Sequence, residues 1–144
     1  MGGDSKIGHV GLTVSDLERS LRFYRDLLGL KEIDRNEFAE ASFGKLTNNP
    51  GAHIRTAMLG SGALLLQLVE YVHGGGERMR LDHRNAGTPH LSFQVEDLDR
   101  TFEEMRRRGV EITSDIVPIT REIRSFYVAD PDGVPVELME GAYP

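Results

Sequence analysis

The chain has 144 residues, a formal net charge of −6 and no cysteine. Its length suits one well-buried domain, and its acidic balance argues against a nucleic acid or an anionic membrane as the main partner, since both are bound through clustered cations. The lack of cysteine excludes disulfides, thiolate metal sites and cysteine nucleophiles, so any metal must be held by nitrogen and oxygen atoms.

Nothing in the sequence predicts a membrane segment or a targeting signal. Apolar runs such as Ala63 to Leu66 are far too short to cross a bilayer. The N-terminus has no charged segment followed by an apolar one. We therefore expect a cytoplasmic protein.

The first residues predict a strand followed by a helix. Apolar and polar side chains alternate from Ile7 to Val14, which places His9 on the polar face of this strand. Ser15 and Glu18 then form a capping-box pattern. The helix that follows has apolar residues at helical spacing and ends at Gly29.

Three further strands complete a first βαβββ module, which covers residues 6–73. They are expected at Lys31 to Glu40, His53 to Leu59 and Ala63 to Val72. Residues 74–88 begin with three consecutive glycines and show no periodicity, so we expect them to link two modules.

Residues 89–141 repeat the plan with shorter parts. A strand with alternating apolar residues starts after His90, and a helix follows it and ends at Gly109. Strands are expected near Val110 to Thr113, Glu122 to Ala129 and Val134 to Glu140, with a turn at DPDG between the last two. The fold class is therefore α+β, with two tandem βαβββ modules that share one domain.

The two modules also repeat each other in sequence. HVGLTVSDLERSL, which begins at His9, recurs as HLSFQVEDLDRTF, which begins at His90, and LQLVE aligns with VELME so that Gln67 matches Glu137. Each module has one apolar sheet face under its helix and one mixed face. We expect the sheets to curve into a cup with the helices outside, so that these four residues lie on the inner wall and bind a divalent cation.

Other interpretations of these residues remain open. A lone histidine on a strand is often structural, Gln67 can simply hydrogen-bond to backbone, and Glu137 can be a strand-edge carboxylate in water. Three further histidines have no partner in the repeat and are not expected to be ligands: His53, His73 and His83.

The doubled plan, the opening HVGLTVSDLERSLRFYRDLLG and the closing FYVADPDGVPVELME resemble the vicinal oxygen chelate superfamily, over Lys6 to Gly141. This superfamily includes glyoxalase I, methylmalonyl-CoA epimerase, extradiol dioxygenases, fosfomycin-resistance transferases and bleomycin-binding proteins. The resemblance implies a cup with one divalent ion per site (Fe, Mn, Co, Ni, Zn or Mg), a small-molecule substrate with adjacent oxygens, and a homodimer.

Within the superfamily, the set His9, Gln67, His90 and Glu137 is most similar to that of methylmalonyl-CoA epimerase, whereas glyoxalase I would have glutamate at position 67. This implies metal-assisted enolisation by an isomerase, epimerase or lyase, with Glu137 as the catalytic base. Arg55 would bind an anionic substrate oxygen. One alternative is an Fe(II) extradiol-type dioxygenase, for which Tyr127 is suitably placed to bind substrate. The other is a non-catalytic ligand-binding protein of the bleomycin-resistance type.

Overall fold

The computed structural model describes residues 3–62 and 64–142, and it divides into two compact units. The first unit comprises residues 1–78 and the second residues 79–144. The division falls inside the segment 74–88 that the sequence analysis expects to link two modules. Each unit is described by itself below.

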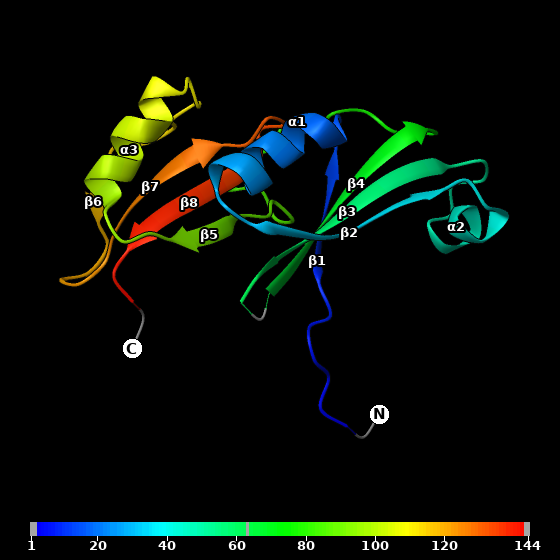
Figure 1. Cartoon of the computed structure of the whole chain (residues 1–144), viewed down its shortest axis with the longest axis horizontal. Coiled ribbons are helices and arrows are strands. Elements are labelled where there is room, and N and C mark those ends of the chain that lie inside the picture. The colour runs from blue at the N-terminus through cyan, green and yellow to red at the C-terminus, as the bar shows by residue number, and fades with distance from the viewer. Residues whose placement is uncertain (1–2, 63, 143–144) are drawn as a thin grey trace. The chain divides into compact units, whose positions relative to one another are not determined.

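The first unit is a four-stranded mixed sheet with its main helical segment on one face (Figure 1). Its strands lie in the order β1-β4-β3-β2, with β1 parallel to β4 and the other pairs antiparallel. Along the chain, its elements are β1 (Val10–Val14), α1 (Leu17–Leu21), η1 (Arg22–Leu27), β2 (Lys31–Phe38), α2 (Ala41–Leu46), β3 (His53–Ser61) and β4 (Leu64–His73).

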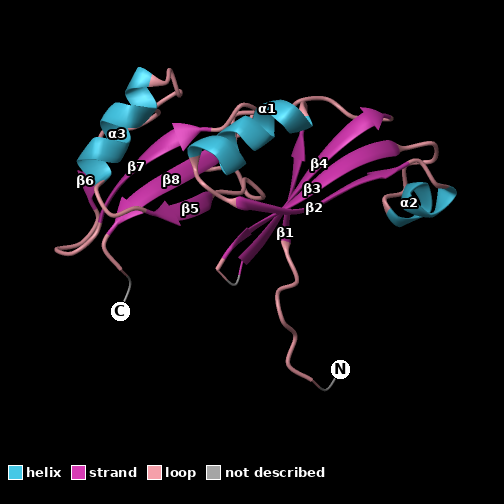
Figure 2. Cartoon of the chain, in the orientation of Figure 1, coloured by secondary structure: helices cyan, strands magenta, loops and turns pink. Residues whose placement is uncertain are grey.

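The second unit repeats this topology (Figure 2). Its order is β5-β8-β7-β6, again with one parallel pair, β5 and β8. Its elements are β5 (Leu91–Gln94), α3 (Leu98–Arg107), β6 (Val117–Pro118), β7 (Arg124–Ala129) and β8 (Pro135–Glu140). The prediction of an α+β fold made of two tandem modules is confirmed.

Helices α1 and α3 are each preceded by an aspartate that caps the helix. The Asp16 carboxylate accepts a hydrogen bond from the backbone N–H of Arg19 at 2.9 Å, and Asp97 does the same with Arg100 at 2.9 Å. The predicted capping box at Ser15 is therefore wrong by one residue. An aspartate at this position satisfies an N–H that the first helical turn leaves unpaired.

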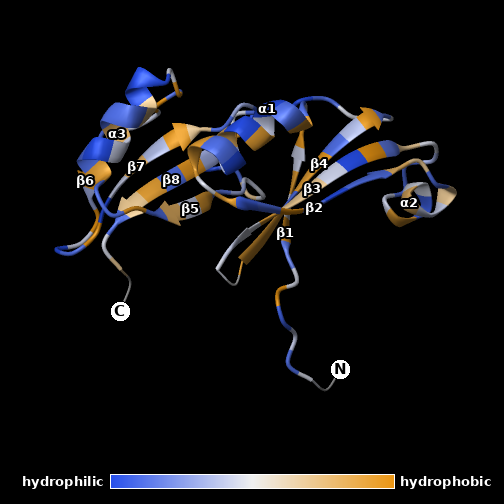
Figure 3. Cartoon of the chain, viewed as in Figure 1, coloured by the Kyte–Doolittle hydropathy of each residue, from blue (hydrophilic) through white to orange (hydrophobic). Residues whose placement is uncertain are grey.

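Each unit has its own apolar core between helix and sheet. In the first unit, α1 contacts β3 and β4, and fully buried side chains such as Leu21, Tyr24 and Leu68 lie there. In the second unit, α3 contacts β7 and β8, where Leu98 and Leu138 are fully buried. Apolar and polar residues alternate along the strands (Figure 3), so each strand has one face toward this core and one face away from it.

Three local features depart from the predicted plan. The short helix α2 lies in the segment between β2 and β3, where no element was expected. The expected strand at Val110 to Thr113 is reduced to an isolated bridge between Ile112 and Val128, and the regular edge strand β6 begins only at Val117. The long predicted helix also changes from α to π geometry at Arg22.

Candidate functional site

The strand register places the repeated residues at equivalent positions in the two sheets. Gln67 on β4 lies opposite Gly11 on β1, and Glu137 on β8 lies opposite Ser92 on β5. His9 and His90 each come two residues before these partners and one residue before the strand begins. The sequence repeat is therefore also a repeat in the pairing of the strands.

In the first unit, Gln67 lies on the sheet face away from α1. Leu66 and Leu68 point into the core, and the half-buried Gln67 alternates with them. Its side-chain oxygen Oε1 would be 4.0 Å from a Cβ placed on Gly11, so the amide extends over β1. His9 is exposed and comes two residues before Gly11, so alternation along β1 places it on the same side of the sheet as Gln67.

In the second unit, Glu137 and Tyr127 are directly paired across β8 and β7, so they share a face. The His90 ring lies on this face too, with its centroid 6.1 Å from that of Tyr127. His83 packs edge-on against Tyr127 at 4.7 Å. Four side chains of this unit therefore gather on one face of its sheet.

His83 was not expected here. The sequence analysis assigned it to a linker, since it has no partner in the repeat, but a compact turn brings it back onto the sheet. The Thr88 hydroxyl donates to the carbonyl of Asp82 at 2.7 Å, and the backbone N–H of Arg84 donates to the Asp82 carboxylate at 3.0 Å. The DHRN sequence is typical of a turn, but it does not indicate which ring the histidine will contact.

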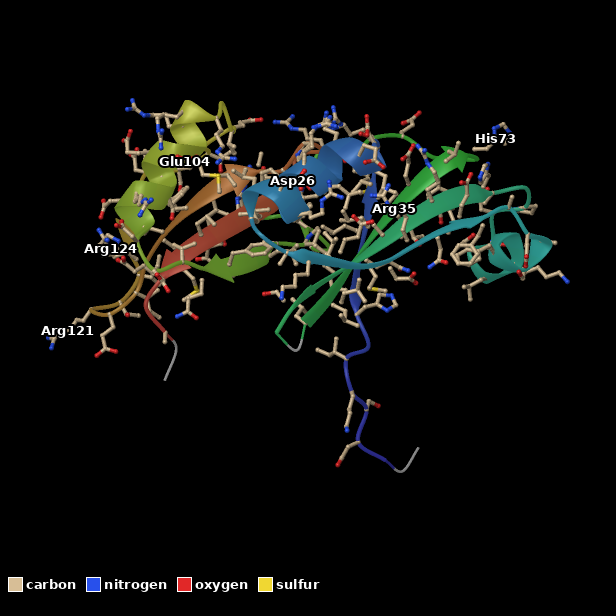
Figure 4. All side chains as sticks on the ribbon, viewed as in Figure 1. Asp26, Arg35, His73, Glu104, Arg121 and Arg124 are labelled. Atoms are coloured by element: carbon tan, nitrogen blue, oxygen red, sulfur yellow. The ribbon has the colours of Figure 1, made fainter. Side chains whose placement is uncertain are left out.

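The opposite sheet faces carry a second repeated arrangement. Glu70 accepts the N–H of Leu17 at 2.9 Å and binds Arg55 at 2.9 Å, and so joins the start of α1 to β3. Glu140 takes the same position in the second unit. It accepts the N–H of Leu98 at 3.3 Å and binds Arg124, which is labelled in Figure 4, at 2.6 Å. These two glutamates fix the starts of α1 and α3. They are the last residues of the repeated LQLVE and VELME, but the sequence pattern did not predict this role.

Arg55 therefore does not lie where the predicted substrate-binding role would require it. Its partner Glu70 alternates with Val69 and lies on the helix side of the sheet, whereas Gln67 lies on the other side. The hydrogen bonds that the Arg55 guanidinium donates to the Glu70 carboxylate raise the pKa of Arg55. Because Arg55 is neutralised on the face opposite to Gln67, we leave it out of the candidate site.

The four predicted ligands have chemistry that fits a divalent cation. Two imidazoles, an amide oxygen and a carboxylate are typical donors for borderline and hard metal ions. The carboxylates of Glu70 and Glu140 bind arginines, whereas the side chain of Glu137 makes no hydrogen bond or ion pair within residues 3–62 and 64–142. Over the same residues, no group of three or more His, Cys, Asp or Glu side chains is close enough to hold a metal, and each unit presents one pair of the predicted set.

Comparison with known proteins connects this arrangement to a class. Residues 6–138 match the Glyoxalase/Bleomycin resistance protein/Dioxygenase superfamily. The chain therefore belongs to this superfamily, as the sequence resemblance implied.

Individual relatives extend along nearly the whole chain. A lactoylglutathione lyase of Haemophilus influenzae is 29% identical over 140 residues, which cover 94% of this chain and 92% of the relative. A crystal structure of a glyoxalase family protein from Bacillus cereus superposes with a TM-score of 0.83 at 21% identity, over 99% of this chain and 97% of that one. A fosfomycin resistance protein from Listeria monocytogenes has a TM-score of 0.69 at 20% identity, covering 97% and 96%. The last two likenesses concern the fold.

Among the described residues, no helix has the length and apolar character needed to span a bilayer.

Proposed function

We propose that the chain is a metal-dependent enzyme that binds one divalent ion through His9, Gln67, His90 and Glu137, and catalyses enolisation of a small substrate with adjacent oxygens, as a lyase or isomerase. The observation that carries this proposal is the doubled register. The same pair of donor positions recurs at the same place in two sheets, and a structural requirement of either sheet alone would not demand polar donors at both places.

The metal would supply polarisation of a substrate carbonyl, which makes the neighbouring C–H more acidic. Glu137 is the carboxylate positioned to take and return that proton. It lies beside Tyr127 and is not engaged by a cation among the described residues. Glu137 and its neighbour Tyr127 are both half-buried, which reduces the water around the carboxylate.

Because Gln67 is uncharged, the four proposed ligands together carry only one negative charge. Two neutral imidazoles, an amide and one carboxylate carry a single negative charge against the two positive charges of the ion. The remaining positive charge favours an anionic enolate over the neutral ketone, which is the difference a catalyst of enolisation needs.

The test combines metal quantitation with proton exchange. Protein purified without oxygen is loaded with Co(II) or Mn(II) and incubated in deuterated solvent with lactoylglutathione or with 2-hydroxyacetophenone, an uncharged hydroxyketone. We expect metal-dependent loss of the α-proton signal of at least one compound. Exchange that proceeds equally in metal-free protein would contradict the proposal.

Histidine variants test the ligand set itself. His90→Ala is expected to lose stoichiometric metal binding. His53→Ala is the matched control, because His53 instead binds Glu37 at 2.5 Å. Full metal binding by His90→Ala would overturn the assigned site and favour a non-catalytic, ligand-sequestering protein.

A second candidate is ring cleavage by an extradiol-type dioxygenase. It is favoured by Tyr127, which lies directly opposite Glu137 and within ring contact distance of His90. Fe(II)-loaded protein should then consume oxygen with catechols. Oxygen uptake would exclude enolisation as the main activity, and its absence together with proton exchange would exclude the dioxygenase.

We also propose that the protein acts as a cytoplasmic homodimer, since the resemblance implies this assembly. Sedimentation equilibrium tests it, and a mass near 16.1 kDa at micromolar concentration would contradict it.

A further inference from the structure

The sheet face around Gln67 is mainly apolar. Met58 is its direct cross-strand neighbour, and Leu65 and Val69 lie two residues away on the same face of β4. All three side chains are half-buried and so remain partly accessible. A substrate held at Gln67 therefore meets methyl and thioether groups.

This face offers few cations to an anionic substrate. On β1, β3 and β4, none of the described positions on the Gln67 side is Lys or Arg. On the edge strand β2, Lys31 does lie on the Gln67 side. It stands at the start of that strand, where it is paired with Gly60. Arg35 and Arg55 belong to the other side and bind carboxylates there.

The second unit shows the same division of charge. Positions on the Glu137 side of β5, β7 and β8 include no Lys or Arg among the described residues, whereas Arg124 on the other side binds Glu140 and Asp99. The arginines at the end of α3 bind Glu103 and Glu104.

The same face of the second unit adds ring surface. Tyr127 is half-buried and His83 is exposed, and their rings meet nearly perpendicularly at 87°. The turn anchored on Asp82 fixes the backbone of His83, so the ring pair is held in place before any ligand arrives. A flat or branched apolar group can pack on such a pair without charge.

We propose that the substrate is an uncharged molecule with an apolar, preferably aryl, group next to its adjacent oxygens, and that this group packs on His83 and Tyr127. The proposal rests on the metal-dependent function proposed above and narrows its substrate class. It sets the chain apart from a glutathione conjugate as substrate, because the described strand positions on these two faces offer the two glutathione carboxylates only Lys31, at a sheet edge.

Hydroxamic acids provide the test, since they chelate a metal through adjacent oxygens and bind without turnover. Calorimetry on the Co(II)-loaded full chain compares benzohydroxamic acid, acetohydroxamic acid and S-(N-hydroxycarbamoyl)glutathione. We expect the benzo compound to bind at least several-fold more tightly than either of the others. Tighter binding of the glutathione derivative would overturn the proposal.

Variants locate the apolar group. His83→Ala should weaken benzohydroxamic acid by about 2- to 10-fold, the worth of one aromatic contact, and leave acetohydroxamic acid unchanged. His83→Phe should restore the affinity, because it keeps the ring. His73→Ala is the control at an exposed histidine on the end of β4 in the other unit (Figure 4). Equal effects of His83→Ala on both hydroxamic acids would refute the assigned contact.

The outcomes separate this proposal from the one on which it rests. If no hydroxamic acid binds in a metal-dependent manner, the proposed function fails. If all bind and the glutathione derivative binds best, the metal function stands and the substrate class is wrong. Lys31→Ala should then weaken the glutathione derivative alone.

Discussion

Replacing Gln67 by glutamate should make the protein less stable without metal and more responsive to it. The substitution preserves the side-chain shape, and the 4.0 Å separation from the Gly11 position leaves room for it. In the metal-free protein, however, a carboxylate would be half-buried between Met58, Leu65 and Val69 without a cation beside it.

The magnitude follows from these surroundings. Partial burial of an unpaired polar group costs about 1 kcal/mol, which lowers the melting temperature of a chain of this length by about 3 °C. Adding a negative charge to the donor set should tighten metal binding on the order of tenfold. At saturating metal, this gives about 1.4 kcal/mol of additional stabilisation, which more than offsets the loss.

Thermal unfolding by circular dichroism, with and without Co(II), measures both effects. We expect the Gln67→Glu melting temperature to lie below the wild-type value without metal and at or above it with metal. Asn85→Asp controls for net charge, since it adds the same charge in an exposed turn. A metal-induced shift equal to that of the wild type would refute Gln67 as a ligand.

Two further predictions concern the scaffold. The hydrogen bond from the backbone N–H of Arg19 lowers the pKa of Asp16. The capping carboxylate therefore stabilises the fold above its ordinary pKa of 3.8, and this stabilisation is lost as the pH falls below that value. The melting temperature of Asp16→Ala should thus be lower than wild type at pH 7, and the difference should vanish in acid; a difference that persists there would contradict the capping role. Gly141→Ala should destabilise by about 3 kcal/mol, because φ is +99° and the new Cβ would lie 2.0 Å from the Glu122 carbonyl oxygen. Gly109→Ala, with φ +70° and open space, should cost only about 1 kcal/mol in denaturant titrations, and equal losses would show that the carbonyl moves away.

The sequence predicted the doubled topology because its two signals are local and mutually consistent. Strand alternation and helix periodicity each determine which face is apolar, and the repeat aligned Gln67 with Glu137 before any contact was known. The helix start was misplaced by one residue because Ser15 and Asp16 are both good caps, and backbone conformation chooses between them.

What the sequence left unresolved depends on pairing between distant segments. The side on which Arg55 lies is determined by its register with Glu70, next to an irregularity between His53 and Ile54 that a strand pattern does not show. The position of His83 depends on how a turn folds back onto β7, which no periodicity encodes. The helix α2 is six residues long and has no side-chain cap, so its start signal is weak.

The strands β4 and β8 each divide their two sides between different tasks. Glu70 and Glu140 hold a helix start on one side, and Gln67 and Glu137, three residues earlier, face the other way. A library that randomises positions 67 and 137 but retains the two anchoring glutamates should therefore alter chemistry at nearly constant foldability. Such a separation would let one scaffold acquire new reactions by few substitutions.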